Sequence, residues 1–294
     1  MRVFLKHRKY WREFILASLF LANIFVWTSV QARQPSNLLH VYFLDIGQGD
    51  SIFIDSPSHG RILVDGGPNS KVLSELGKIL PFGDRRIDVV IESHPDADHI
   101  GGLVDVLNEY SVGLFLEPGV ESPNKIDNAI HQIVQEKNIP DILARRGMKI
   151  NLGDGAELEI LFPNQDVSNW ETNDASIVAK LIYGDESFLL TGDSTKKAEY
   201  LLLALNPDEL KSNVLKAGHH GSHTSSSLPY VEAVSPEYAV ISAGAKNTYG
   251  HPHQDVLDIF NKLNIKIVST ESVRNLKGLG TIEFETDGET LEIK

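Results

Sequence analysis

The sequence predicts an α/β protein in which two β-sheets pack face to face and helices cover their outer faces. Three observations favour this fold class. Both halves of the chain contain several short apolar strands followed by alternating strands and helices. Polar clusters begin at His94, Asp193 and His219, each where a predicted strand ends, and open α/β sheets carry their chemistry at such ends. The chain has 294 residues, enough to bury a sizeable core.

The first 32 residues differ in composition from the rest of the chain. Five basic residues precede an apolar stretch at 14–30, which is the layout of a signal peptide or of a membrane anchor. The cleavage motif at Val30-Gln31-Ala32 is weak and the stretch is long enough to span a bilayer, so we favour an uncleaved anchor. A polar linker at 33–38 follows. In either case we expect the domain at 39–294 to lie outside the cytoplasm.

The first half of the chain alternates between apolar strands and amphipathic helices. The glycine-containing turn at 47–50 separates the first two strands, and Pro81 ends the first helix. In chain order we expect strands at 39–46, 51–54 and 61–64, a helix at 71–80, a strand at 87–92, a helix at 99–109, a strand at 112–116 and a helix at 124–136.

The second half repeats this organisation. A series of strands comes first, and strand and helix pairs follow it. We expect strands at 149–152, 158–162, 175–183 and 187–190, a helix that ends near 205, strands at 212–216 and 238–241, a helix at 254–263, and closing strands at 265–268, 281–285 and 290–293.

The strongest chemical signal is the turn after the strand at 87–92. Within six positions it carries the imidazoles of His94 and His99 and the carboxylates of Asp96 and Asp98. A single such residue would usually cap the helix that follows. Four of them are hard to explain as caps, because each buried carboxylate needs a positive partner. The pattern therefore predicts a bound divalent metal.

Composition narrows the chemistry further. The chain has no cysteine, which excludes disulfides, thiolate zinc sites and cysteine nucleophiles. Any metal must be held by histidine and carboxylate, a donor set that suits zinc, manganese or iron. Forty acidic and 27 basic residues give a net charge of −13, so no broad basic surface is expected. Near the motif loops the only basic residues are Lys216, Lys246 and Arg274.

Seven of the eleven histidines fall in three clusters, at His94 and His99, at 219–223, and at 251–253. With these clusters, the motifs resemble those of the metallo-β-lactamase fold hydrolases, and most closely the metal-binding domain of ComEC-type competence proteins. The motifs that carry the resemblance are His94-x-Asp96-x-Asp98-His99, Gly47-Gln48-Gly49-Asp50-Ser51, Leu63-Val64-Asp65-Gly66-Gly67, Asn173-Asp174, Thr191-Gly192-Asp193, His219-His220-Gly221-Ser222 and Tyr249-Gly250-His251-Pro252-His253. The resemblance covers about 39–290 and implies a four-layer αββα sandwich.

The resemblance implies two divalent ions, zinc or manganese. His94 and Asp96 would bind one ion, Asp98 and His99 the other, and Asp193 would bridge them. His219 or His220 would complete the second site. We place His219 in the ligand set and His220 among the catalytic residues, although either could be the ligand. Adjacent residues on an extended segment point in opposite directions, so we expect the two to have different roles.

Other motif residues receive supporting roles. Asp98, His220 and His251 are the predicted catalytic residues, and His251 would contact the scissile group or protonate the leaving group. The resemblance places Asp65 where it would orient a ligand histidine through the second ring nitrogen. Residues outside the ligand set are expected to stabilise loops, cap helices or lie in solvent: Gln48, Asp50, His223, His253, His40, His59 and His131. Asp174 is either a weaker ligand or part of a turn.

Two positions depart from the wider superfamily. Asp96 stands where a histidine is usual, and Asn173-Asp174 stands where a further histidine ligand is usual. Both departures resemble the ComEC subgroup, and they make one metal site richer in oxygen. The chain also lacks the many membrane helices and the oligonucleotide-binding domain of full competence channels. We therefore expect a hydrolase module on a single anchor.

The expected function is an extracytoplasmic phosphodiesterase or nuclease that uses a hydroxide bridging two metals. Its substrate would be DNA or a smaller phosphodiester, and bound cations would have to offset the acidic surface. One alternative is carbonyl hydrolysis of a lactam, lactone or thioester on the same metal site. Another is a non-catalytic binding module anchored to the membrane, which the number of intact ligand positions disfavours.

Overall fold

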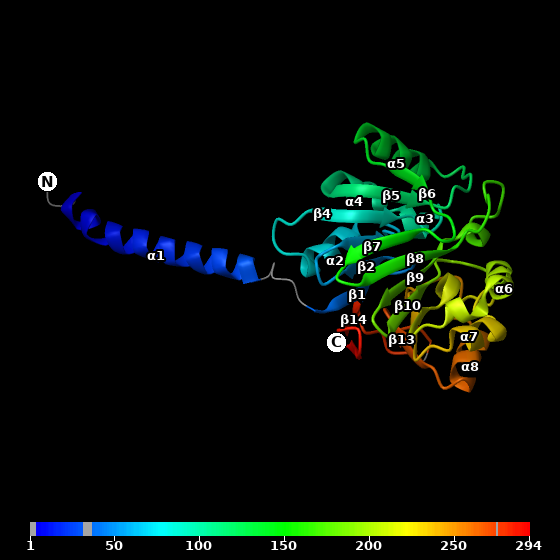
Figure 1. The fold of residues 1–294 in the computed structure, drawn as a ribbon. Coiled ribbons are helices and arrows are strands. Elements are labelled where there is room, and N and C mark those ends of the chain that lie inside the picture. Colours follow the sequence, from blue (N-terminus) through cyan, green and yellow to red (C-terminus); the bar gives the residue numbers. More distant parts are fainter. Residues whose placement is uncertain (1–3, 32–36, 275) are drawn as a thin grey trace.

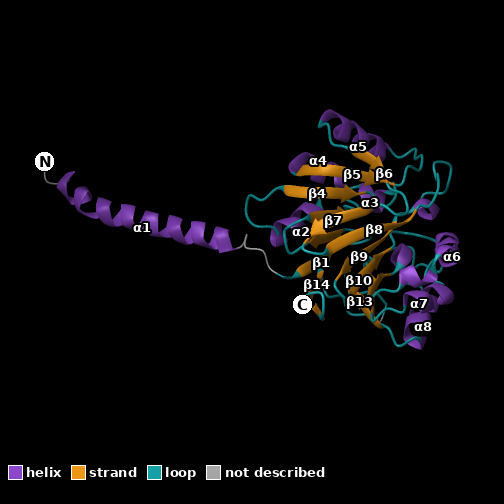
Figure 2. Cartoon of the chain, in the orientation of Figure 1, coloured by secondary structure: helices purple, strands orange, loops and turns teal. Residues whose placement is uncertain are grey.

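The computed structural model describes residues 4–31, 37–274 and 276–294. Two β-sheets lie face to face at the centre of the domain, and helices cover the pair on both sides (Figure 1, Figure 2). The α/β class and the packing of two sheets with outer helices are confirmed.

The first sheet has eight strands. Their bounds are β1 (Leu39–Phe43), β2 (Ile52–Asp55), β3 (Arg61–Val64), β4 (Arg86–Ile91), β5 (Ser111–Glu117), β6 (Asp141–Leu143), β14 (Ile282–Thr286) and β15 (Leu291–Ile293). The order is β15-β14-β1-β2-β3-β4-β5-β6, antiparallel as far as β3 and parallel beyond it. Val64 pairs with Ile91, so the polar segments after β3 and β4 emerge at the same edge.

The second sheet has seven strands with the same change of direction. Their bounds are β7 (Lys149–Gly153), β8 (Ala156–Phe162), β9 (Val178–Tyr183), β10 (Glu186–Leu190), β11 (Val214–Lys216), β12 (Tyr238–Ile241) and β13 (Lys266–Ser269). The order is β13-β12-β11-β10-β9-β8-β7, antiparallel from β7 to β10 and parallel from β10 to β13. Leu189 pairs with Leu215, so the segments after β10 and β11 also share an edge.

Helices cover the outer face of each sheet. Those on the first sheet are α2 (Lys71–Ile79), α3 (Ala97–Ile100), α4 (Leu103–Glu109) and α5 (Lys125–Glu136). Those on the second are α6 (Lys196–Leu205), α7 (Leu228–Val234) and α8 (Gln254–Lys262). Short 3₁₀ turns occupy Asn173–Ala175, Pro207–Leu210 and Gly218–Gly221.

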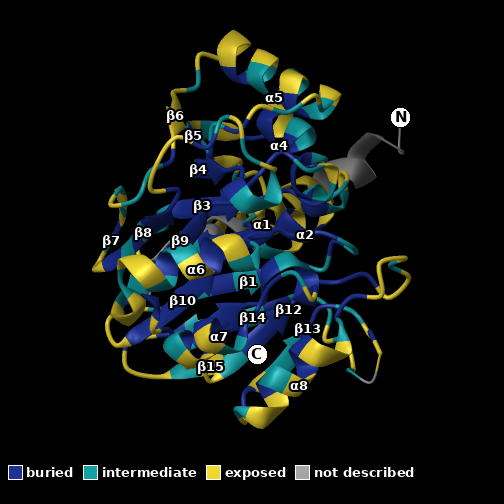
Figure 3. Ribbon diagram, turned by 90° about the vertical axis from the view of Figure 1, so that its right-hand side faces the viewer, coloured by how far each residue is buried: buried dark blue, intermediate teal, exposed yellow. Residues whose placement is uncertain are grey.

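Three apolar clusters correspond to the three interfaces between these layers. The largest lies between the sheets and includes Phe43, Leu158, Phe188 and Phe284. A second packs α2, α4 and α5 onto the first sheet, and a third packs α6, α7 and α8 onto the second. Figure 3 shows the central strands of both sheets in the buried colour and the outer sides of the helices exposed. Helices with one apolar stripe produce this layering, because each stripe must be covered.

Most predicted elements occur within a few residues of their expected bounds, but the helix expected at 99–109 is two helices. α3 and α4 are separated at Gly101 and Gly102. The sequence prediction also missed β6 and α7. β6 has three exposed residues, and α7 begins with Leu228-Pro229 directly after a run of serines, so neither carries a clear apolar periodicity.

The N-terminal helix α1 spans Phe4–Gln31. Its described side chains, at 10–24, are exposed. Within the described residues, no helix combines the length and the apolar character required to cross a membrane.

We predict that Phe284→Ala destabilises the domain by about 3–5 kcal/mol, because it opens a cavity between the sheets. The fully buried Phe284 ring lies 5.9 Å from the Phe43 ring, 5.8 Å from Phe188 and 5.6 Å from Tyr238, measured between centroids. Urea unfolding followed by circular dichroism measures the change. Phe82→Ala, at a side chain 96% exposed, is the control and should change stability little. Equal effects of the two substitutions would contradict this packing.

Candidate metal centre

The turn after β4 forms one wall of the site. His94 and His99 are fully buried, whereas the side chains of Asp96 and Asp98 are 39% and 34% exposed. Asp96 occupies the N-cap position of α3, but its side chain makes no capping hydrogen bond. The capping explanation for this carboxylate therefore does not hold.

Asp193 joins the two halves of the cluster. It follows β10 in the second sheet and is 3% exposed. Its Oδ1 lies 3.3 Å from His99 Nε2, and its Oδ2 lies 3.3 Å from His220 Nε2. Ligand atoms of His94, His99 and Asp193 all lie within 4.8 Å of one another. One carboxylate thus contacts imidazoles that come from both sheets.

A second group of ligand atoms overlaps the first. Asp98, His99 and His220 also offer atoms within 4.8 Å of one another, and His220 Nε2 lies 3.3 Å from Asp98 Oδ2. Since Asp193 reaches both groups through different oxygens, it occupies the position that a bridging ligand requires.

The expectation that His219 and His220 lie on an extended segment is wrong. Both have positive φ angles, 47° and 54°, within a 3₁₀ turn, and both rings face Asp193. The Nε2 of His220 lies 3.3 Å from Asp193 Oδ2, and that of His219 lies 3.7 Å from it. His220 is fully buried and also contacts Asp98, whereas the His219 side chain is 24% exposed. The geometry favours His220 as the ligand and His219 as its neighbour, the reverse of our assignment.

The two remaining ligand candidates differ in their surroundings. Asp96 Oδ2 lies 3.6 Å from His94 Nε2, and its Oδ1 accepts a hydrogen bond of 2.8 Å from Thr172 Oγ1. Asp174 instead accepts a hydrogen bond from Thr195, and its Oδ2 lies 3.0 Å from Lys197 Nζ. Because an ammonium already compensates the Asp174 carboxylate, the geometry favours a structural role for it at the start of α6.

Asp65 orients the histidines of the cluster through hydrogen bonds on the side away from the ligand atoms. Its Oδ2 accepts hydrogen bonds from His99 Nδ1 at 2.8 Å and from Ser93 Oγ at 2.6 Å, and its Oδ1 accepts from the Ser93 backbone N–H at 2.7 Å. Ser93 Oγ in turn lies 3.0 Å from His94 Nδ1. These contacts turn Nε2 of both histidines toward the site. The contact between Asp65 and His99 Nδ1 is the one that the resemblance implied for Asp65.

A buried ion pair lies beneath His220. Lys216 is fully buried, and its Nζ contacts the carboxylate of Asp50, which is 1% exposed. Asp50 Oδ1 also lies 3.4 Å from His220 Nδ1, whose hydrogen bond goes to the Ser242 carbonyl at 2.8 Å. Lys216 is therefore part of the support of the site and offers no charge to a substrate. The sequence marked Asp50 only through the Gly47-Gln48-Gly49-Asp50 motif.

Glycine allows these loops to approach one another. A Cβ on Gly49, whose φ is 118°, would lie 2.0 Å from the Asp98 carbonyl oxygen. A Cβ on Gly102 would lie 2.2 Å from the Gly66 carbonyl oxygen. Only glycine permits such close backbone contacts, so the glycines of the sequence motifs allow Asp50 and Asp65 to lie beside the metal-binding turn.

The cluster has an uneven distribution of protons. Burial and the neighbouring His99 lower the pKa of His94 to about 3, so His94 is neutral. Burial alone would lower the pKa of His99, but the carboxylates of Asp193 and Asp65 raise it well above its ordinary value. Burial opposes ionisation of Asp193, yet His220 and His99 hold its pKa well below its ordinary value. A divalent cation would displace the protons that His99 and His220 carry here.

The donor atoms fit a metal. The Nε2 atoms of His94, His99 and His220 and the Oδ1 of Asp193 are buried without a partner in hydrogen-bonding geometry. Buried polar atoms are rarely left unpaired, and these four atoms converge from two sheets. Imidazole nitrogen and carboxylate oxygen without thiolate suit zinc or manganese.

The cluster opens into a pocket of about 140 Å³. Its lining residues are Gln48, Asp96, Asp98, Asp193, His219, His220, Tyr249 and His251. His251 is 7% exposed, and burial together with His220 and His219 lowers its pKa to about 4. Tyr249 is 66% exposed and stacks on His251 with 5.6 Å between ring centroids. Gln48 and Tyr249 became candidates only when the pocket brought their motifs together.

His40, His59, His223 and His253 lie outside the metal cluster and do not line this pocket. His253 occupies the N-cap position of α8, but its side chain makes no capping bond and instead accepts the His223 backbone N–H at 3.2 Å. Of the roles expected for His253, the structure shows support of a neighbouring loop and no capping of the helix by its side chain. His40 pairs with Glu283 at 2.9 Å and His59 with Asp55 at 3.2 Å.

Comparison with known protein families identifies the superfamily of this domain. The family model described as the metallo-beta-lactamase superfamily matches residues 44–245. This range contains the turn after β4, Asp193 and the turn with His219 and His220, and it ends before His251.

The chain is also similar to curated proteins and solved structures. It is 33% identical to ComE operon protein 3 of Bacillus subtilis over 83% of this chain and 32% of that protein. It is 32% identical to Competence protein ComA of Neisseria gonorrhoeae over 84% of this chain and 33% of that protein. The chain thus spans about a third of the length of these relatives. Igni18, a metallo hydrolase from Ignicoccus hospitalis, shares the fold with a TM-score of 0.53, at 17% identity over 84% of this chain and 99% of that one.

We predict that Asp65→Asn weakens metal binding by about 10–100-fold, because His99 loses the carboxylate that orients it and raises its basicity. Competition with a chromophoric zinc chelator measures the affinity. Asp258→Asn, at an exposed residue of α8, is the matched control and should leave the affinity unchanged. A folded Asp65→Asn protein with wild-type affinity would contradict the role given to Asp65.

Lys216→Met should destabilise the metal-free protein by about 3–5 kcal/mol, because it leaves the Asp50 carboxylate buried without its ammonium partner. Adding Asp50→Asn should recover part of the loss, since the unpaired charge is then removed. Urea unfolding in the presence of a chelator compares the wild type, both single variants and the double variant. Strictly additive effects would show that the two residues are not coupled.

Proposed function

The chain belongs to the metallo-beta-lactamase superfamily, and from that premise we propose that it is a phosphodiesterase or nuclease that uses two divalent ions. The family match and the donor set support metal-dependent hydrolysis. The observation that carries the finer proposal is the oxygen-rich pocket wall, where Asp96, Asp98 and Asp193 face the imidazoles. The similarity to proteins named for competence adds support for a phosphodiester substrate.

The proposed ligand sets overlap at Asp193. We assign His94, Asp96 and His99 to the side that faces Asp193 Oδ1, and Asp98 and His220 to the side that faces Oδ2. This assignment moves His99 away from Asp98, with which the resemblance had grouped it. When bound, two such ions supply a nucleophilic water near neutral pH and polarise a phosphoryl oxygen. The carboxylates contribute negative charge, and the imidazole nitrogens contribute neutral ligand atoms. Together they would bind dications without cysteine.

Residues of the pocket position the substrate. His251 faces the pocket and has a buried Nδ1 without a hydrogen-bond partner. A neutral imidazole there can donate one N–H to the oxygen that gains charge during cleavage. Gln48 faces the same pocket, and its Oε1 is held by the Gly244 backbone N–H at 3.1 Å, which leaves its amide N–H₂ free to donate.

The charges near the pocket favour a small phosphodiester or a short strand. Lys216 is buried beneath the site, and Arg274 donates to the carbonyl oxygens of Pro252 and Gly250. Of the three basic residues near the motif loops, only Lys246 is exposed and has no side-chain partner within the part of the chain that the structure describes. Long nucleic acids usually bind along an extended basic stripe. Attraction must therefore come mainly from the bound cations.

The purified protein loaded with Mn²⁺ or Zn²⁺ should hydrolyse bis(p-nitrophenyl) phosphate, and a chelator should stop the reaction. Asp193→Asn should reduce kcat/KM by more than the roughly 10–100-fold typical of residues that only support a ligand, because both ligand sets lose a carboxylate. Asp154→Asn, in the exposed β7–β8 turn, is the control. Hydrolysis of nitrocefin or of thioesters, without cleavage of any phosphodiester in a panel, would overturn the proposal.

A further inference from the structure

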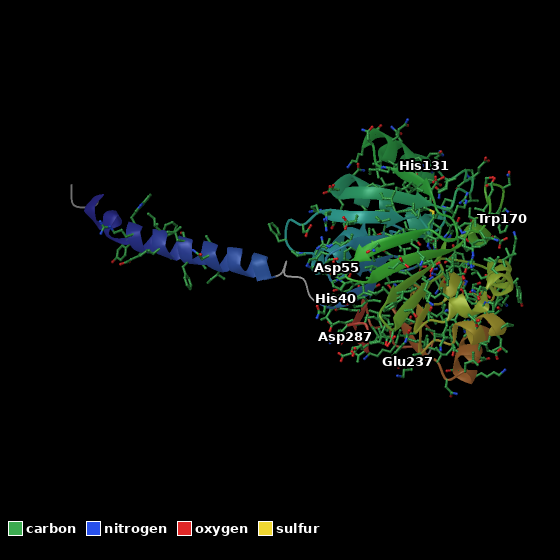
Figure 4. The ribbon with its side chains drawn as sticks, viewed as in Figure 1. His40, Asp55, His131, Trp170, Glu237 and Asp287 are labelled. Carbon is green, nitrogen blue, oxygen red and sulfur yellow. The ribbon has the colours of Figure 1, made fainter. Side chains whose placement is uncertain are left out.

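A second group of ionisable side chains lies beneath α5, outside the pocket of the metal centre. His131, labelled in Figure 4, and Asp127 are one turn apart on α5 and share one face of the helix. Glu117 ends β5 and Asp141 begins β6, the strand beside it. Glu92 directly follows β4. Three neighbouring parallel strands and one helix therefore contribute to this group.

The two nitrogens of His131 face different carboxylates. Nδ1 lies 3.4 Å from Asp141 Oδ2, whereas Nε2 lies 3.4 Å from Asp127 Oδ1 and 3.9 Å from Glu117 Oε2. Histidines that bind metals typically have this arrangement, with a carboxylate on one ring nitrogen and the ion on the other. Asp141 therefore has the position of an orienting residue, and Nε2 points into the group.

Two buried carboxylates in the group lack sufficient partners. Glu92 is 1% exposed, and its Oε2 has no hydrogen-bond partner. The Oδ1 of Asp127, which is 7% exposed, has no partner in hydrogen-bonding geometry either. Glu92 lies beside Glu117 across β4 and β5, because Ile91 pairs with Leu116 and the Glu92 backbone N–H donates to the Leu116 carbonyl at 2.9 Å. Burial of an unpaired carboxylate is unfavourable, so a cation is expected to compensate it.

A proton on His131 supplies only part of that compensation. Contact with Asp127 is the main cause that raises the pKa of His131 to about 9, so the free imidazole is protonated at neutral pH. One imidazolium contacts the carboxylates of Glu117, Asp127 and Asp141, and Glu92 adds a fourth carboxylate beside Glu117. The His131 side chain is 37% exposed, so a cation can reach the group from solvent.

We propose that Glu92, Glu117, Asp127 and His131 bind one further divalent cation, zinc or manganese, separate from the metal centre, with Asp141 orienting His131. Mixed imidazole and carboxylate donors suit these ions. The ion would tie α5 to the ends of β4 and β5. The same ion would also support the metal-binding turn. Glu92 is two residues before His94, and the α5 N-cap Asn124 donates to the Pro95 carbonyl at 2.9 Å.

The experiment measures bound zinc in the full chain by mass spectrometry after dialysis against limiting free Zn²⁺. His131→Gln and Asp127→Asn should each bind about one zinc ion fewer per chain than the wild type. His59→Asn is the matched control, because His59 pairs with a single carboxylate, Asp55, and should not change the zinc content. Two different variants guard against misfolding of either one, and circular dichroism checks both.

A second measurement separates this site from the metal centre. In a His94→Ala, Asp193→Asn background, about one zinc ion per chain should remain, and His131→Gln should remove it. Zn²⁺ should raise the melting temperature of that background but not of its His131→Gln derivative. Equal zinc content with and without His131 would overturn the proposal and leave a salt-bridge cluster only. Neither readout depends on catalytic activity, so the result is independent of the proposed reaction.

Discussion

The structure depends on balancing buried negative charge where the two sheets meet. Asp50, Asp65 and Asp193 are each at most 3% exposed and lie at the ends of strands or in the adjoining loops. Each has a positive or hydrogen-bonding partner: Lys216 for Asp50, His99 and Ser93 for Asp65, and two imidazoles for Asp193. Carboxylates without such partners would not remain ionised in this environment, so the same contacts stabilise the fold and prepare a metal site.

The two-sheet architecture makes that balance possible. The parallel pairs β3–β4 and β10–β11 deliver their polar loops to one edge of each sheet, and the face-to-face packing brings the two edges together. Gly49 and Gly102 then allow the loops to approach one another more closely than residues with a Cβ at these two positions would permit. Residues separated by about a hundred positions, such as His99 and Asp193, thereby become neighbours.

The group beneath α5 shows the same arrangement of imidazole and carboxylates as the metal centre. In both, an imidazole is held through Nδ1 by a carboxylate, Asp65 for His99 and Asp141 for His131, while Nε2 faces further acidic groups. The groups differ in surroundings, because the first opens into a pocket lined by Tyr249 and His251 and the second lies under a helix. That difference favours chemistry at the first and structural support at the second.

The sequence by itself determined the fold class, most strand and helix positions, and the ligand-type residues after β4, because apolar periodicity and local clusters of polar residues are properties of neighbouring positions. Only the tertiary structure favours His220 over His219 as the ligand candidate, because His220 is fully buried and contacts both Asp193 and Asp98, whereas the His219 side chain is 24% exposed. It also showed that Lys216 is buried against Asp50, and that His131, which had no motif, lies among carboxylates. These outcomes depend on contacts between distant segments, which spacing along a single chain does not encode.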